Sequence, residues 1–131
     1  MITTLDVSAA IQILFQKEKS KKFQEIIEKS LLITAPDLYI CELSNVLWKY
    51  HKANMLTQEE CIEYIEDGIN FIDVFVDSKQ IWQEAFQEGV KNNHSIYDMY
   101  YVIITRNNNG ILLTNDNDIL NICEKLSIES Y

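Results

Sequence analysis

Apolar residues recur along this chain in short runs, separated by stretches in which they return every three or four positions. The short runs, bounded by polar or turn-forming residues, predict buried β-strands, and the alternation in FIDVFV predicts another strand. We therefore expect strands at residues 1–5, 31–36, 71–76 and 111–116, and a terminal edge strand at residues 126–130.

The stretches between the strands predict helices. Ser8 is expected to cap a helix over residues 9–16, Asp37 is expected to cap a long amphipathic helix, and Thr57 opens a T-Q-E-E capping box. Further helices are expected within residues 17–30, over 78–93, over 97–108 (apolar on nearly every side) and around 119–125.

This alternation of strands and helices predicts an α/β fold with a mainly parallel sheet covered on both faces. With 131 residues, 47% of them hydrophobic, the chain is expected to form a single domain over residues 1–131. No apolar run approaches the roughly 20 residues that a membrane span needs. The N-terminus has no signal-like segment, so we expect a cytoplasmic location and no membrane partner.

Four acidic residues stand at positions that simple surface chemistry does not explain. Asp6 and Asp116 follow core strands, Asp98 begins an apolar helix, and Glu42 lies on a polar face of the helix after Asp37. A carboxylate beside an apolar run is costly unless something compensates it. Ligand sites in parallel sheets lie beyond the carboxyl ends of the strands. We therefore expect the four acids to share one site.

Carboxylates gathered at one place repel one another unless a cation lies among them. A hard divalent cation such as Mg²⁺ takes one or two carboxylates directly and keeps several waters. Such a cation can activate water and stabilise the oxygens of a phosphodiester during hydrolysis. The pattern thus favours metal-assisted hydrolysis, and the chain offers no convincing covalent nucleophile.

Each acid also has a purely structural interpretation. Asp6 could cap the first helix, Glu42 could be a solvated helix residue, and Asp98 could be a simple N-cap. Of the neighbours Asp116 and Asp118, we expect Asp118 to cap the following helix. The prediction of a shared metal site therefore depends on the four acids together and not on any one of them.

Other residue types add little chemistry. Cys41, Cys61 and Cys123 fit no zinc spacing and are expected to be buried thiols, and His51 and His94 are expected to cap helices or lie on the surface. We expect most of the aromatic residues Trp48, Tyr50, Trp82 and Phe86 to pack in the core, although they could form a dimer face. The net charge of −9, with ten lysines and one arginine, argues against a general nucleic-acid-binding surface.

The segments TLDVSAA, APDLYICELSNVL and HSIYDMYYVIITRNNNGILLTNDNDIL together resemble the PIN domain. Within that family the chain is most similar to the VapC group, the toxins of bacterial type II toxin–antitoxin pairs. The resemblance extends over nearly the whole chain. It implies a three-layer α/β/α fold, Mg²⁺- or Mn²⁺-dependent endoribonuclease activity on RNA, a cognate antitoxin partner and a homodimer.

Carried over residue by residue, the acidic quartet of the family falls on Asp6, Glu42, Asp98 and Asp116, which become the expected catalytic and metal-binding residues. The supporting residues are Ser8 and Thr114, with Asp118 as an additional acid. The chain departs from the family at Met99, where a small residue is common. Its candidate RNA-facing lysines are Lys17, Lys19, Lys21, Lys22, Lys49 and Lys52, which also fit a solvated loop and helix end.

Two functions from different classes therefore remain. The first is a metal-dependent endoribonuclease, and the second is a PIN-like module that binds metal, RNA or protein without turnover. A phospho-acceptor receiver domain is also α/β, but the paired early acids and the late lysine of such domains are missing here.

Overall fold

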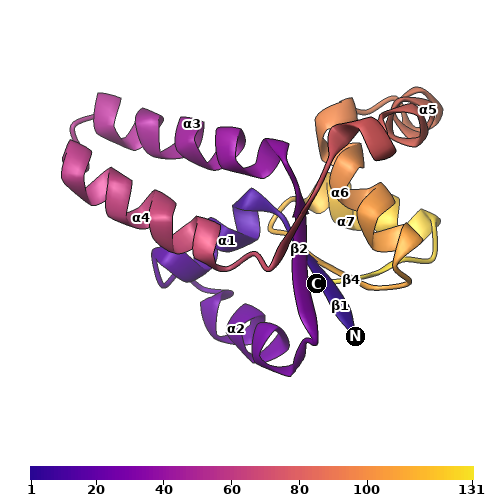
Figure 1. Ribbon diagram of the computed structural model, residues 1–131, viewed down its shortest axis with the longest axis horizontal. Helices are drawn as coiled ribbons and strands as arrows, with labels where there is room; N and C mark the ends of the chain where they lie inside the picture. The colour runs from indigo at the N-terminus through magenta and orange to yellow at the C-terminus, as the bar shows by residue number, and fades with distance from the viewer.

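The computed structural model, which describes residues 1–131, contains a five-stranded parallel sheet in the order β3-β2-β1-β4-β5. The strands are β1 (Ile2–Leu5), β2 (Leu32–Pro36), β3 (Val74–Val76), β4 (Ile111–Leu113) and β5 (Glu129–Ser130). Helices α1–α4 lie on one side of this sheet and α5–α7 on the other (Figure 1). The expected α/β/α fold is confirmed, with β1 and β4 at the position where the strand order reverses.

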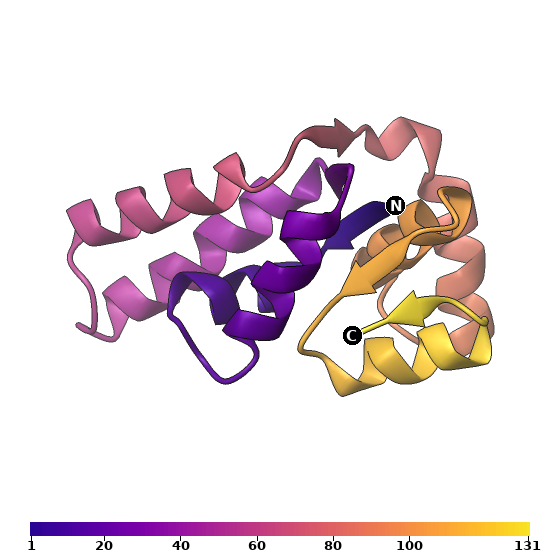
Figure 2. The same cartoon turned by 90° about the horizontal axis from the view of Figure 1, so that it is seen from below.

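The helices are α1 (Val7–Leu14), α2 (Ser20–Lys29), α3 (Leu38–Lys52), α4 (Gln58–Asn70), α5 (Trp82–Asn92), α6 (Ile96–Asn107) and α7 (Asn117–Lys125), with a 3₁₀ turn, η1 (Ser78–Gln80), before α5. Helices α3 and α4 run side by side and project beyond the sheet as an arm (Figures 1 and 2). None of the helices is long and apolar enough to cross a lipid bilayer.

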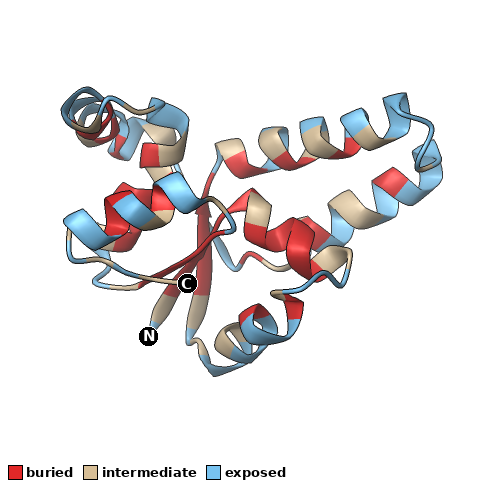
Figure 3. Ribbon diagram, turned by 180° about the vertical axis from the view of Figure 1, so that it is seen from behind, coloured by how far each residue is buried: buried red, intermediate tan, exposed pale blue.

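The core is centred on α6, which packs against β1, β2 and β4. Five consecutive residues of this helix, Tyr101–Thr105, are buried, as the apolar character of its sequence predicts. Leu5, Leu112 and Leu113 of the central strands are also fully buried. Figure 3 shows buried residues along the sheet and the inward helix faces, while the tip of the α3–α4 arm is exposed.

Several local predictions are wrong. Helix α1 begins at Val7, so Asp6 and not Ser8 occupies the N-cap position. Asp37 occupies the N-cap position of α3, as expected, but its side chain forms no capping bond, because its carboxylate accepts hydrogen bonds from the backbone and hydroxyl of Ser78. The strand expected over residues 71–76 is limited to β3, since α4 continues to Asn70. The capping box of Thr57 and Glu60 is confirmed.

The buried faces of α3 and α5 also differ from the predicted ones. Cys61 and Cys123 are buried as expected, but Cys41 is exposed on α3. Trp48, Trp82 and Phe86 are exposed by 53%, 55% and 54%, so their expected core packing is wrong.

A close approach of two backbones at the end of α6 gives a test of this fold. A Cβ added at Gly110 would overlap the carbonyl oxygen of Ile2, which cannot move without shifting β1. Gly110→Ala should therefore destabilise the protein by about 1–3 kcal/mol in urea unfolding. Asn107→Ala, at an exposed helix end nearby, is the control and should cost little. Equal stabilities for the two variants would contradict this packing.

Candidate functional site

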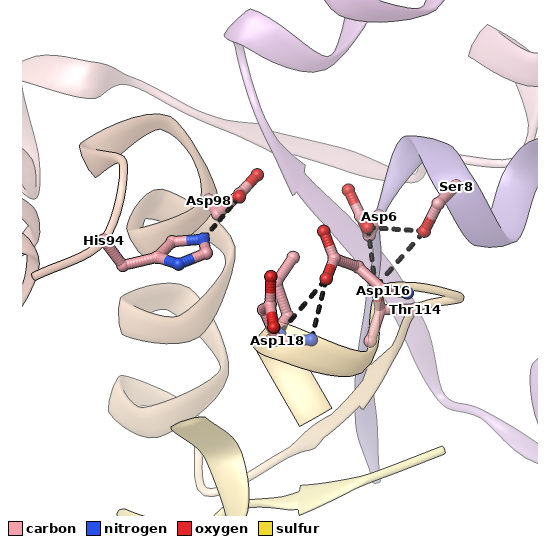
Figure 4. A network of polar contacts seen from close by, with 8 residues as sticks. Asp6, Ser8, His94, Asp98, Thr114, Asp116 and Asp118 are labelled. Atoms are coloured by element: carbon pink, nitrogen blue, oxygen red, sulfur yellow. Dashed lines mark hydrogen bonds and ion pairs between the residues drawn. The ribbon is translucent and has the colours of Figure 1, made fainter. Parts of the chain in front are cut away.

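Asp6 is the buried centre of a hydrogen-bonded network at the carboxyl end of β1. Its backbone N–H donates to the carbonyl oxygen of Leu113, which joins the ends of β1 and β4. The hydroxyls of Ser8 and Thr114 both donate to its Oδ2, each over 2.7 Å. Ser8 and Thr114, predicted as supporting residues, therefore both hold the same carboxylate oxygen (Figure 4). Their bonds leave Oδ1 without a side-chain partner.

This environment disfavours the charged form of Asp6. Burial raises the pKa of Asp6, the two hydroxyls oppose that rise, and the carboxylate of Asp98 adds to it. No lysine or arginine forms an ion pair with Asp6. The site therefore contains a buried carboxylate whose charge the protein itself does not neutralise.

Asp98 lies in the first turn of α6, where the free N–H groups of a helix favour a negative charge. The interpretation of Asp98 as an N-cap is wrong, because Ser95 occupies that position. The Oδ2 atom of Asp98 lies 2.7 Å from Nε2 of His94. His94 precedes α6 and holds the carboxylate of Asp98 on the side away from Asp6 (Figure 4).

Glu42 reaches the same region from the second turn of α3. Its Oε1 accepts a hydrogen bond of 2.6 Å from the hydroxyl of Tyr101. Burial is the main cause that raises the pKa of Glu42 to about 7, and Asp6 and Asp98 raise it further, against the effect of the Tyr101 bond. The alternative interpretation, in which Glu42 is a solvated residue on the helix surface, is therefore wrong.

Asp116 caps α7, and the expected cap by Asp118 is wrong. The Oδ1 atom of Asp116 accepts from the backbone N–H groups of Asp118 and Ile119. The helix begins at Asn117, which leaves Asp116 in the extended N-cap conformation and Asp118 exposed in the first turn. The backbone N–H of Asp116 donates to Thr114 Oγ1, so Asp116 joins the network around Asp6.

The four acids therefore come from four elements to the carboxyl end of the central strands, but they do not surround a closed metal site. No group of three or more His, Cys, Asp or Glu side chains is placed to hold a metal ion. Each acid is held by a different neighbour. Ser8 and Thr114 hold Asp6, and Tyr101 holds Glu42. His94 holds Asp98, and the first backbone N–H groups of α7 hold Asp116. The donor set, all carboxylate oxygens, matches a hard cation that takes one or two carboxylates and keeps waters for the others.

Two residues of this site, His94 and Tyr101, were not predicted. His94 stands four positions before Asp98, a spacing that places two side chains on one helical face, so this signal was present in the sequence. In the sequence, Tyr101 has no feature that sets it apart from the other apolar residues of its helix. Its partner Glu42 is 59 positions away, and no local pattern connects them.

The parallel sheet has helices on both sides, and its four acids lie at the carboxyl ends of β1 and β4, where the strand order reverses. This is the usual position of the ligand site in a doubly wound α/β domain. The PIN domain family matches residues 3–125, so the chain belongs to this family. Ribonuclease VapC3 of Pyrobaculum aerophilum is 26% identical over 121 residues, which cover 91% of this chain and 92% of that protein.

The fold comparison agrees with this assignment. The crystal structure of PAE2754 from Pyrobaculum aerophilum matches with a TM-score of 0.75 and 18% identity, over 93% of this chain and 84% of that chain. At this identity the likeness concerns the fold.

The raised pKa of Glu42 predicts a pH-dependent stability. In the unfolded chain Glu42 titrates near 4.5, and in the folded state at about 7, so the folded state binds this proton more tightly. The stabilisation is complete below pH 4.5 and is lost as the pH rises through 7. Because Glu42 is only half-buried, the loss should be of the order of 1 kcal/mol.

Glu42→Gln removes this titration. In urea unfolding without divalent metal, the variant should be more stable than the wild type at pH 8 and nearly equal to it at pH 5. Glu63→Gln, at an exposed position of α4, is the control. A difference between Glu42→Gln and wild type that does not change with pH would contradict the assignment.

Proposed function

We propose that this protein is a metal-dependent endoribonuclease and the toxin of a type II toxin–antitoxin pair. The observation that carries the proposal is the position of Asp6, Glu42 and Asp98 beside one another at the carboxyl end of the sheet. Asp98 adds to the raised pKa of Asp6, and Asp6 and Asp98 add to that of Glu42. None of the three forms an ion pair with a lysine or arginine. Membership in the PIN family and the relative named ribonuclease VapC3 support the same chemistry.

In this proposal Asp6, Asp98 and Asp116, with Glu42, hold Mg²⁺ or Mn²⁺ directly or through water. When bound, such an ion supplies an activated water and stabilises negative charge on the phosphate oxygens. Ser8 and Thr114 orient Asp6 by donating to Oδ2, which leaves Oδ1 for the ion. The hydrogen bond with His94 orients Asp98 from the opposite side. Asp118, exposed in the first turn of α7, is the additional acid.

The proposed partners follow from charge and exposure. A cognate antitoxin with a basic side chain beside Asp6 would offset the uncompensated acids and block the site. A homodimer is supported by an apolar stripe on α5 formed by Trp82, Phe86 and Val90, which follow one another at one-turn spacing and are exposed by 55%, 54% and 68%. Monomeric soluble proteins rarely leave such surface uncovered.

A binding module without turnover is the second candidate, and one observation favours it. Arg106, the only arginine, forms ion pairs with Glu84 and Glu88 and so is engaged within the protein. With a net charge of −9, RNA contacts would depend on lysines. Metal-dependent cleavage by the purified protein distinguishes the two candidates.

Activity is the first test. The protein, purified free of antitoxin and given RNA with Mn²⁺, should cleave it. Asp6→Asn and Asp98→Asn should each lower the cleavage rate by roughly 100-fold or more, since each removes a charge that holds the ion. Asp67→Asn, on the exposed side of α4, should cleave like the wild type. Undiminished cleavage by Asp98→Asn would refute the assignment.

Metal binding is the second test and needs no RNA. A ligand that binds only the folded state stabilises it by about 2.7 kcal/mol at a hundredfold excess over its Kd. The melting temperature should therefore rise with millimolar Mn²⁺ in the wild type and in Asp67→Asn, and rise much less in Asp98→Asn. The proposal predicts no such rise with Na⁺ at matched ionic strength. The same shift in Asp98→Asn and wild type would count against a metal site at these residues.

A further inference from the structure

Tyr101 connects the two halves of the acidic site. Its ring lies in the first half of α6 and is completely buried, and its hydroxyl donates to Oε1 of Glu42 on α3 over 2.6 Å. The two helices belong to opposite sides of the sheet (Figure 1). This single hydrogen bond therefore joins α3 and α6 at the carboxyl end of the sheet, where the four acids lie.

The hydroxyl of Tyr101 acts only as a donor here. Burial raises the pKa of Tyr101 far above its usual range, and the carboxylates of Asp6 and Glu42 raise it further. A buried hydroxyl without a partner would be costly, so the bond to Glu42 is strongly favoured. It engages Oε1 and leaves Oε2 of Glu42 without a hydrogen-bond donor from another side chain.

Helix α6 thus serves the site twice. Asp98 and Tyr101 are separated by three positions and lie on one face of the helix. Asp98 brings its own carboxylate to the site, and Tyr101 fixes a carboxylate that belongs to another helix. Glu42 has no other hydrogen-bonded side chain, so its conformation depends on Tyr101.

We propose that Tyr101 is a positioning residue of the acidic site, which holds Glu42 in the conformation needed for binding a divalent cation. The inference rests on the proposed nuclease function. Tyr101 touches neither the ion nor RNA in this proposal and acts through Glu42. The competing view is that its hydroxyl has only a structural role, as the satisfied polar group of a buried ring.

Tyr101→Phe separates the two views, and Tyr39→Phe is a matched control. Tyr39 is equally buried and donates one bond of 2.7 Å, but to the backbone carbonyl oxygen of Gly68. Each substitution removes one buried hydrogen bond and keeps the ring, so both should lower the melting temperature by similar amounts. Only Tyr101→Phe should weaken Mn²⁺ binding, by about tenfold to a hundredfold, as expected when a partner of a metal ligand is removed.

Mn²⁺ affinity is measured by the electron paramagnetic resonance signal of free Mn²⁺, without RNA. Cleavage is then measured at saturating Mn²⁺, where kcat should fall in Tyr101→Phe with little change in KM for RNA. A double-mutant cycle completes the test: in a Glu42→Gln background, Tyr101→Phe should cause no further loss of affinity.

The possible results are distinct. Wild-type affinity and kcat in Tyr101→Phe, or equal losses in Tyr39→Phe, would overturn the positioning role while leaving the nuclease assignment intact. Additive losses in the double-mutant cycle would also overturn it, because Tyr101 would then act independently of Glu42. A wild-type protein that binds no Mn²⁺ and leaves RNA uncleaved would reject both proposals.

Discussion

The burial of the Asp6 carboxylate at the end of β1 is the constraint on which the rest of the site depends. A charge at this depth requires donors, and the chain supplies them from both ends of its sequence, through Ser8 on α1 and Thr114 after β4. The backbone N–H of Asp6 also donates to the carbonyl oxygen of Leu113 in β4. The pairing of β1 with β4 and the polar network therefore share the same residue. The carboxylate of Asp98 adds to the raised pKa of Asp6, and the cation of the proposed function would offset this repulsion.

Helix α6 packs against this centre from one side of the sheet. It is buried between the sheet and α5 and α7, and its first two turns carry Asp98 and Tyr101, which face the polar site. Small residues of α5 make this packing close, because a Cβ at Gly89 would collide with Ile96. Helix α5 therefore turns Ala85 and Gly89 inward and its large apolar residues outward.

This reversal on α5 shows which features the sequence could predict. The strands, the order of the elements and the approximate positions of Asp6, Asp98 and Asp116 follow from periodicity and from the rule that parallel strands deliver residues to one edge. The inward face of α5 could not be predicted, because its apolar stripe of Trp82, Phe86 and Val90 looked like a core face. Which of Asp116 and Asp118 caps α7 depended on the exact residue at which the helix begins. The bond between Tyr101 and Glu42 depends on packing across the sheet, which has no local signal.

The network around Asp6 also has a consequence for how the protein is made. Asp6 is synthesised before its donor Thr114, which follows 108 positions later. β1 lies between β2 and β4, so the central strand stays unpaired on one side until residues 111–113 have left the ribosome. Contacts of such sequence separation form late, after the local helices. A nascent chain therefore carries Asp6 without the completed network until β4 and Thr114 have been synthesised.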